Sequence, residues 1–233
     1  MSNDRRRAVV TGSSSGIGLA IARRLLDDGW HVTGFDLAPA TLAHAAFTAV
    51  AVDLCDGAAT AEASLAAIDG GAVDALVHAA GVLRVGTLGA LDAGAGQRMW
   101  QLHVDALTRI ADVLMPCMQK ASHGRVVVVG SRVARGMAGR SQYAATKAAL
   151  VALARSWAAE VVADGVTVNV VSPAATATAM LDDPARKTAA PRVPPMGRLI
   201  QPQEIAALVA YLLSADAAAI TGQEIQICGG ASL

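Results

Sequence analysis

Residues 7–19 read RAVVTGSSSGIGL, and the organisation of the whole chain follows from them. A short apolar run ends at Thr11 and Gly12 in a turn rich in glycine and serine. Gly16 and Gly18 then open a pattern with helical spacing. The N–H groups of a first helical turn have no partner within the helix, and the helix dipole adds partial positive charge. This strand, turn and helix therefore predict a binding site for an anion.

The glycines also suggest which anion binds. Gly12 and Gly16 let the backbone approach a pyrophosphate where a Cβ atom would collide, and Gly18 lets the helix lie close to the sheet. The spacing is G-x3-G-x-G rather than the commoner G-x-G-x-x-G. The same segment also reads G-x-S-x-G, the nucleophile elbow of serine hydrolases, with Ser14 as nucleophile. That alternative requires an Asp and then a His at later strand ends, whereas the last histidine, His123, falls in a predicted helix-to-strand turn.

The bulk composition narrows the class of protein. Of the 233 residues, 54% are hydrophobic and 3% aromatic, which favours a buried α/β core over disorder. The formal net charge is zero, which argues against nucleic-acid or acidic-membrane binding, and no apolar run is long enough to span a membrane. The three cysteines form no C-x-x-C pair, so we expect neither a disulfide framework nor a metal site. These features predict a soluble, cytoplasmic protein.

Short apolar runs alternate with helical patterns along the chain. Strands are predicted at 8–10, 31–36, 48–53, 73–78, 125–129, 166–171 and 224–227. Helices are predicted at 17–28, 57–69, 97–118, 142–163 and 202–213, with a proline-rich loop at 177–195. No repeat or linker divides the chain. We therefore expect one α/β domain over residues 1–233, a Rossmann-like doubly wound parallel sheet of about seven strands with helices on both faces.

Polar or glycine residues follow six of these strands, and ligands bind beyond the carboxyl ends of parallel strands, so we expect one shared cleft. Asp36 can accept hydrogen bonds from both hydroxyls of an adenosine ribose and would repel a 2′-phosphate. No cation stands beside it at 13–15 or at Leu37, which favours NAD over NADP. Asp53 either accepts from the adenine amino group or stabilises a turn.

A second constellation points to acid–base chemistry. Tyr143 and Lys147 lie four residues apart in a predicted helix and hence on one face of it. A cation beside a phenol favours the phenolate and lowers its pKa from about 10. Ser131, at the preceding strand end, is placed to hold a substrate hydroxyl or carbonyl against Tyr143. The alternative interpretation is that Tyr143 and Lys147 are two exposed side chains on the surface of this helix, without a catalytic role.

Over essentially its whole length the chain resembles the short-chain dehydrogenase/reductase family. The resemblance rests on Thr11-Gly12-x3-Gly16-Ile17-Gly18, Ala79-Ala80-Gly81, Ser131, Tyr143-x3-Lys147, Asn169–Thr178, Ile220-Thr221-Gly222 and Gly229-Gly230. It implies Tyr143 as general acid/base, Lys147 as ligand of the nicotinamide ribose, Ser131 as substrate-orienting residue and Asn169 as a structural residue. The implied cofactor contacts are Gly12, Ser14, Ser15, Gly16, Ile17, Gly18, Asp36, Asp53, Ala80, Gly81, Tyr143, Lys147, Pro173, Thr176 and Thr178. It also implies a homo-oligomer, a tetramer or dimer, formed through the helices at 97–118 and 142–163.

Four elements of the family pattern differ here. The family's Asn-Asn-Ala-Gly is His78-Ala79-Ala80-Gly81, its Pro-Gly after the sixth strand is Pro173-Ala174, and its terminal Asp-Gly-Gly is Cys228-Gly229-Gly230. The active-site Asn of the long helix, which in the family holds a proton-relay water, is His103. Histidine can donate and accept hydrogen bonds, so His103 either carries the relay with altered pH dependence or is a packed structural residue.

Within the family, the blocks 32–36, 74–86, 202–205 and 229–233 resemble 2,3-dihydro-2,3-dihydroxybenzoate dehydrogenases. These enzymes of siderophore synthesis, and relatives acting on dihydro-hydroxyanthranilate in antibiotic pathways, oxidise a ring carbinol of a cyclohexadiene acid with NAD. The ketone then tautomerises to an aromatic ring. The substrate lid, at about 178–197, is short for that group. Such a substrate needs a carboxylate anchor, for which the candidates are Arg84, Arg132, Arg135, Arg140, Arg186 and Arg192, each otherwise a solvated surface charge.

Two other functions stay open at this point. One is an NAD(P)H-dependent ketoreductase of 3-oxoacyl groups or small cyclic ketones. The other is a non-catalytic NAD-binding regulator, suggested by His103 and Ala174, although retention of Ser131, Tyr143 and Lys147 argues against it.

Overall fold

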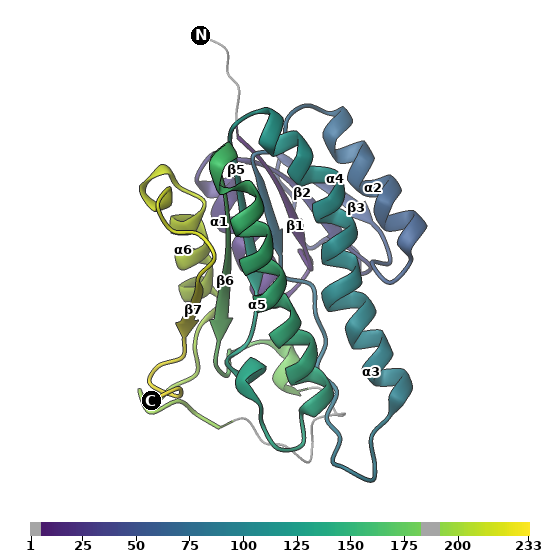
Figure 1. Cartoon of the computed structure of the whole chain (residues 1–233), viewed down its shortest axis with the longest axis vertical. Helices are drawn as coiled ribbons and strands as arrows, with labels where there is room; N and C mark the ends of the chain where they lie inside the picture. The colour runs from purple at the N-terminus through teal and green to yellow at the C-terminus, as the bar shows by residue number, and fades with distance from the viewer. Residues whose placement is uncertain (1–5, 183–191) are drawn as a thin grey trace.

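The computed structural model describes residues 6–182 and 192–233 (Figure 1). Seven parallel strands form one sheet in the order β3-β2-β1-β4-β5-β6-β7. The strands are β1 (Arg7–Thr11), β2 (His31–Asp36), β3 (Phe47–Ala51), β4 (Ala75–His78), β5 (Gly124–Val129), β6 (Val166–Pro173) and β7 (Glu224–Ile227). Strand β1 pairs with both β2 and β4, so the strand order reverses beside it, which is where such sheets bind ligands. The predicted doubly wound sheet is confirmed.

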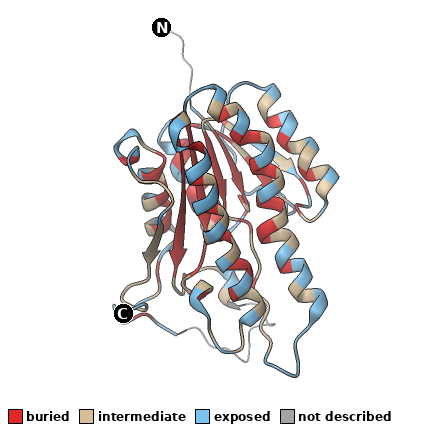
Figure 2. Cartoon of the chain, viewed as in Figure 1, coloured by how far each residue is buried: buried red, intermediate tan, exposed pale blue. Residues whose placement is uncertain are grey.

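Helices cover both faces of this sheet (Figure 1). One face carries α2 (Gly57–Asp69), α4 (Ala106–Lys120) and α5 (Ser141–Val161), and the other carries α1 (Gly16–Asp27) and α6 (Pro202–Leu212). Side chains alternate along a strand, so each strand contributes to two apolar cores. In β5, Val126 and Val128 pack with residues of α4 and α5, whereas Val127 and Val129 pack with residues of α1 and α6. The strands between these layers are largely buried (Figure 2).

The largest difference from the predicted elements is in the helix expected at 97–118. It begins earlier, as α3 (Ala93–Trp100), passes through a π-helical turn (Gln101–Asp105) and continues as α4. Asp92 explains the early start, because its side chain accepts a hydrogen bond from the N–H of Ala95 and so caps the helix. Helical periodicity does not show the π turn, which contains His103.

Smaller differences affect strand ends and the proline-rich loop. The third strand lies at 47–51, the fourth begins at Ala75, and β6 extends to Pro173 because it pairs with β7 there. The loop predicted at 177–195 contains a short 3-10 helix (Ala179–Asp182). Part of the expected lid, 183–191, and with it Arg186, lies outside the described residues. Within the described part of the chain, no helix is both long and apolar enough to cross a membrane.

Candidate active site

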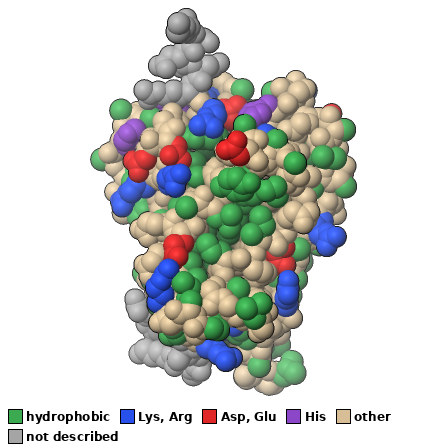
Figure 3. Space-filling view, turned by 90° about the vertical axis from the view of Figure 1, so that its left-hand side faces the viewer, with side chains coloured by type: hydrophobic (Ala, Val, Ile, Leu, Met, Phe, Trp, Pro, Cys, Tyr) green, Lys and Arg blue, Asp and Glu red, His purple; other side chains and the backbone are tan. Residues whose placement is uncertain are grey.

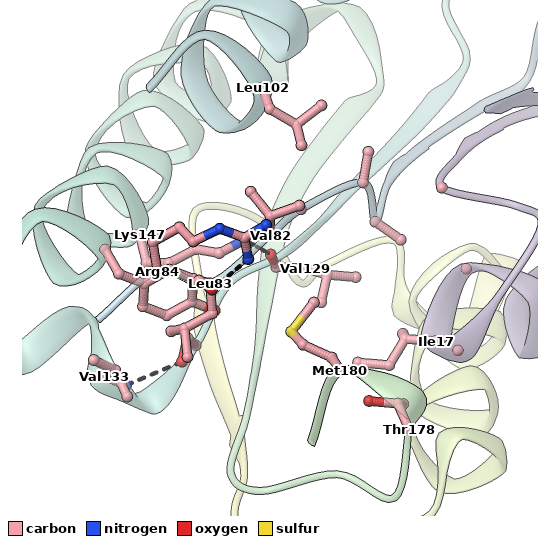
Figure 4. Close-up of a pocket in the computed structure, with 18 of the residues that line it drawn as sticks. Ile17, Val82, Leu83, Arg84, Leu102, Val129, Val133, Lys147, Thr178 and Met180 are labelled. Carbon is pink, nitrogen blue, oxygen red and sulfur yellow. Dashed lines mark hydrogen bonds between the residues drawn. The ribbon is translucent and has the colours of Figure 1, made fainter. Parts of the chain in front are cut away.

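The carboxyl ends of the strands open into a cleft with a volume of about 1480 Å³. Every residue expected to contact a cofactor lines it except Ser14, and Ser131 lines it as well. Figure 4 shows Ile17 and Thr178 on one side of this cleft and Lys147 and Val129 on the other. Residues from six strand ends therefore meet at one place, as the polar strand ends predicted.

The glycine turn after β1 leaves no room for larger residues. Gly12 has φ +70°, and a Cβ atom there would lie 2.9 Å from the backbone Cα of Ala80. A Cβ atom on Gly18 would overlap with the carbonyl oxygen of Gly12, so helix α1 packs directly on the turn. Ser15 begins α1 without capping it through its side chain. The uncapped first turn and the bare backbone fit the pyrophosphate of a dinucleotide.

Thr11 ties this turn to the end of β4. Its hydroxyl accepts hydrogen bonds from the N–H groups of Ala79 (3.1 Å) and Ala80 (3.0 Å), and so donates its own hydrogen to Nδ1 of His78 (3.0 Å). His78 is fully buried, and burial, with a smaller effect of Lys147, lowers its pKa to about 3. His78 is therefore a neutral hydrogen-bond acceptor in the place of the family's first Asn.

Asp36 stands at the end of β2 beside the turn. Its carboxylate accepts the N–H of Ser14 (2.9 Å) and the N–H of Ala38 (2.9 Å), which holds it at the mouth of the cleft. Leu37, its neighbour, is 71% exposed and carries no charge. Asp53 accepts the N–H of Cys55 (2.9 Å) in a turn and also lines the cleft, so both roles considered for it are compatible with its position.

Ser131, Tyr143 and Lys147 lie together at the other end of the cleft. Lys147 is buried, its Nζ donates to the carbonyl of Val129 (2.9 Å), and it lies 5.8 Å from the centroid of the Tyr143 ring. Burial lowers the pKa of Lys147 to about 7. Ser131 is buried, and its Oγ accepts the N–H of Val133 (3.2 Å), which orients the hydroxyl at the start of a short 3-10 helix.

His103 lies behind the cleft and is completely buried. Its Nε2 accepts the N–H of Val82 (3.0 Å), and its Nδ1 lies 2.8 Å from the hydroxyl of Thr146. That hydroxyl donates to the carbonyl of Tyr143 (2.9 Å), so it accepts from Nδ1–H. Burial, and secondarily Lys147, lowers the pKa of His103 well below 6.5. The imidazole is thus neutral with both nitrogens bonded to protein, an arrangement that favours the structural alternative over the relay.

Val82 and Thr146 are functional neighbours that the sequence reasoning missed, and Thr11, which it quoted only as part of the glycine motif, also bonds to the end of β4. Thr146 directly precedes Lys147, but its bond to His103 joins residues 43 positions apart and leaves no local signal in the sequence.

The arginines considered as carboxylate anchors fall into those that line the cleft and those that do not. Those that line the cleft are Arg84, Arg132, Arg140 and Arg192. Arg135 does not, and lies instead on the surface at 4.0 Å from Glu224.

Known enzymes and solved structures resemble this chain over nearly its whole length. The family model described as enoyl-(acyl carrier protein) reductase matches residues 12–232. The 3-oxoacyl-(acyl-carrier-protein) reductase FabG of Vibrio cholerae is 36% identical over 236 residues, with 96% of each chain covered. A 2,3-dihydro-2,3-dihydroxybenzoate dehydrogenase of Escherichia coli is 34% identical over 241 residues, again with 96% of each covered. A structure of an actinorhodin polyketide ketoreductase variant with NADPH has a TM-score of 0.87 at 26% identity and covers 98% of both chains.

Proposed function

Since the chain belongs to the short-chain dehydrogenase/reductase family of oxidoreductases, we propose that it is an NAD-dependent dehydrogenase of ring secondary alcohols. The substrate that we infer is a cyclohexadiene acid of the dihydro-dihydroxybenzoate or dihydro-hydroxyanthranilate type, as used in siderophore or antibiotic biosynthesis. The observation that carries the proposal is the grouping of Ser131, Tyr143 and Lys147 at one end of a cleft that has Asp36 at its other end. The similarity to a dihydrodihydroxybenzoate dehydrogenase supports the substrate class.

The roles of the residues follow from their positions. Ser131 holds the substrate oxygen, and Tyr143 removes the hydroxyl proton as the carbinol carbon loses its hydride. A nicotinamide held in this cleft beside Lys147 would supply the acceptor for that hydride. Lys147, 5.8 Å from the Tyr143 ring, stabilises the phenolate whenever its amine is protonated. Aromatisation of the resulting ketone makes oxidation the favoured direction.

We infer NAD rather than NADP from the charge around Asp36. A 2′-phosphate would meet this carboxylate, and Ser13, Ser14, Ser15 and Leu37 provide no cation to compensate. The NADPH bound to the polyketide ketoreductase shows that a protein with this fold can take the other cofactor, so the two must be compared directly.

A 3-oxoacyl ketoreductase is the second candidate, and the similarity to FabG favours it. The substrate end of the cleft has apolar walls formed by Val133, Met137, Met180 and Leu181, which also suit an acyl chain. The deciding experiment compares oxidation of cyclic hydroxy acids by NAD or NADP with reduction of acetoacetyl thioesters by NADH or NADPH. Faster thioester reduction would replace the first proposal by the second, and the absence of turnover in every reaction would leave the non-catalytic regulator.

The homo-oligomer and the cytoplasmic location remain predictions. The interface expected for a homo-oligomer is formed by the helices at 97–118 and 142–163. A different face, which carries α6 and β7, shows a central group of hydrophobic side chains with charged ones around it (Figure 3). Light scattering of the purified protein tests the oligomer.

A further inference from the structure

We propose that Ser14 and Thr41 are positioning residues for Asp36, which hold the loop after β2 against the glycine turn and thereby increase the preference for NAD over NADP. This inference rests on the proposed use of NAD, and it extends that preference to two residues that do not line the cleft. Both act through the carboxylate of Asp36.

The loop that follows β2, residues 37–41, has little structure of its own to hold it in place. It contains no helix or strand, and all of its residues are exposed. A segment with so little buried surface opens locally at a low cost in free energy. Asp36 is the last residue of β2, so the orientation of its side chain depends on the hydrogen bonds that fix this loop.

Ser14 directs all three of its hydrogen-bonding groups toward that loop and Asp36. Its N–H donates to Oδ2 of Asp36 (2.9 Å), its hydroxyl donates to the carbonyl of Ala38 (3.0 Å), and its carbonyl accepts from the hydroxyl of Thr41 (2.9 Å). Ser14 is 6% exposed. These bonds explain why Ser14, alone among the residues expected to contact a cofactor, does not line the cleft.

The glycine turn gives the loop a firm support. The N–H of Gly12 donates to the carbonyl of Phe35 in β2 (2.8 Å). Ser13 lies so close to the same strand that a Cβ atom on Gly34 would overlap with the Ser13 hydroxyl. The turn is therefore fixed on the sheet, and the bonds of Ser14 connect the loop to a part of the chain that does not move with it.

The result is a carboxylate with a fixed direction. Oδ2 of Asp36 accepts the N–H of Ser14, and Oδ1 accepts the N–H of Ala38 (2.9 Å). Each oxygen keeps a further lone pair, and the two N–H groups set the plane in which those lone pairs point. A ribose with two free hydroxyls can donate to them, whereas a 2′-phosphate meets a fixed negative charge. When the loop opens, the bond from Ala38 is lost and the carboxylate can turn away from such a phosphate.

Thr41 allows the cleanest test, because it is exposed and its replacement leaves the core unchanged. Thr41→Val keeps the shape of the side chain without its donor, and Thr41→Ser keeps the hydroxyl. Thr48→Val, which removes an exposed threonine hydroxyl from β3, is the matched control. Ser14→Ala removes the bond to Ala38 and probes the same tie from the other side.

Fluorescence titration of the purified variants with NADH and with NADPH measures the preference without turnover. Thr41→Val should raise the Kd of NADH by about 2- to 10-fold, the effect of one lost hydrogen bond, and should not raise the Kd of NADPH. The ratio of the two Kd values should therefore move toward NADPH by the same factor. Ser14→Ala should move it in the same direction, whereas Thr41→Ser and Thr48→Val should keep the wild-type ratio.

A purely structural role would weaken the binding of both cofactors alike, because loss of folded protein does not distinguish a 2′-hydroxyl from a 2′-phosphate. Equal weakening of NADH and NADPH, or a ratio that Thr41→Val leaves unchanged, would overturn the proposal. Hydrogen exchange gives a second readout: the amide of Ala38 should exchange faster in Thr41→Val than in Thr48→Val, and equal rates would also contradict the proposal.

These measurements separate this inference from the proposed function. Tighter binding of NADPH than of NADH by the wild-type protein would refute the proposed use of NAD, whereas a ratio shifted by Thr41→Val would still support the role of Thr41. If Ser14→Ala does not fold, Thr41→Val decides by the same two measurements.

Discussion

His103 offers the sharpest test of how this active site is held together, through two single replacements. In Asn, the side-chain amide ends near the place of Nδ1, which bonds to Thr146. In Gln, it reaches the place of Nε2, which accepts the N–H of Val82. Each variant therefore retains one of the two hydrogen bonds and loses the other.

The expected magnitudes differ because the lost bonds differ. His103→Asn leaves the partly buried N–H of Val82 without an acceptor, which costs about 1–3 kcal/mol. His103→Gln leaves only an acceptor site of Thr146 unused, since that hydroxyl still donates to the carbonyl of Tyr143, and the cost is about 0.5–1 kcal/mol. A difference of about 1 kcal/mol corresponds to roughly 2–4 °C in Tm for a chain of this size. We expect the Asn variant to be the less stable of the two.

Urea and thermal unfolding of the ligand-free variants measure this difference, and kcat measured against pH tests the relay. His103 has a pKa well below 6.5, so it stays neutral across the working range and both variants should keep the wild-type pH midpoints. Equal stability of the two variants would contradict the acceptor role. A pH profile shifted by His103→Asn, with unchanged NAD affinity, would return His103 to the proton relay.

Three further results are expected. Tyr143→Phe should lower kcat by about 10²- to 10⁴-fold and leave NAD binding by fluorescence titration nearly intact, and retained turnover would remove Tyr143 from the mechanism. Asp36→Ala should lower kcat/KM with NAD by roughly 10-fold or more and raise the relative use of NADP. An unchanged ratio of kcat/KM with NAD to kcat/KM with NADP would show that Asp36 does not determine the cofactor preference. For Lys147, burial lowers the pKa from 10.5 in the unfolded chain to about 7 in the folded protein. Between these two pH values the unfolded chain binds more protons than the folded one. The wild-type ligand-free protein should therefore become more stable as the pH rises from 7 toward 10. Lys147→Met should lack this gain in urea unfolding at pH 7, 8 and 9, and a stability difference from wild type that does not vary with pH would mean that the amine titrates normally.

The amino-acid sequence was sufficient for the fold because each of its signals is local. The strand, turn and helix of residues 7–19 need only the glycine spacing and the change of hydrophobic period, and the alternation of such units implies a parallel sheet. The Tyr143–Lys147 pair needs only helical periodicity. Element ends were less well predicted, because caps and pairing set them, as at Asp92 and at the end of β6.

Contacts between distant residues decided the rest. Whether His103 relays protons or only accepts and donates structural hydrogen bonds depends on its partners Val82 and Thr146. These partners lie 21 and 43 positions away in the sequence and come together with His103 only when α3, α4 and α5 pack on the sheet. Which of the candidate arginines line the cleft has the same origin, since composition counts charges but only packing places them in a cleft. Periodicity along a chain reports which face of an element is buried, whereas a proton's position and a cation's neighbours are properties of the assembled site.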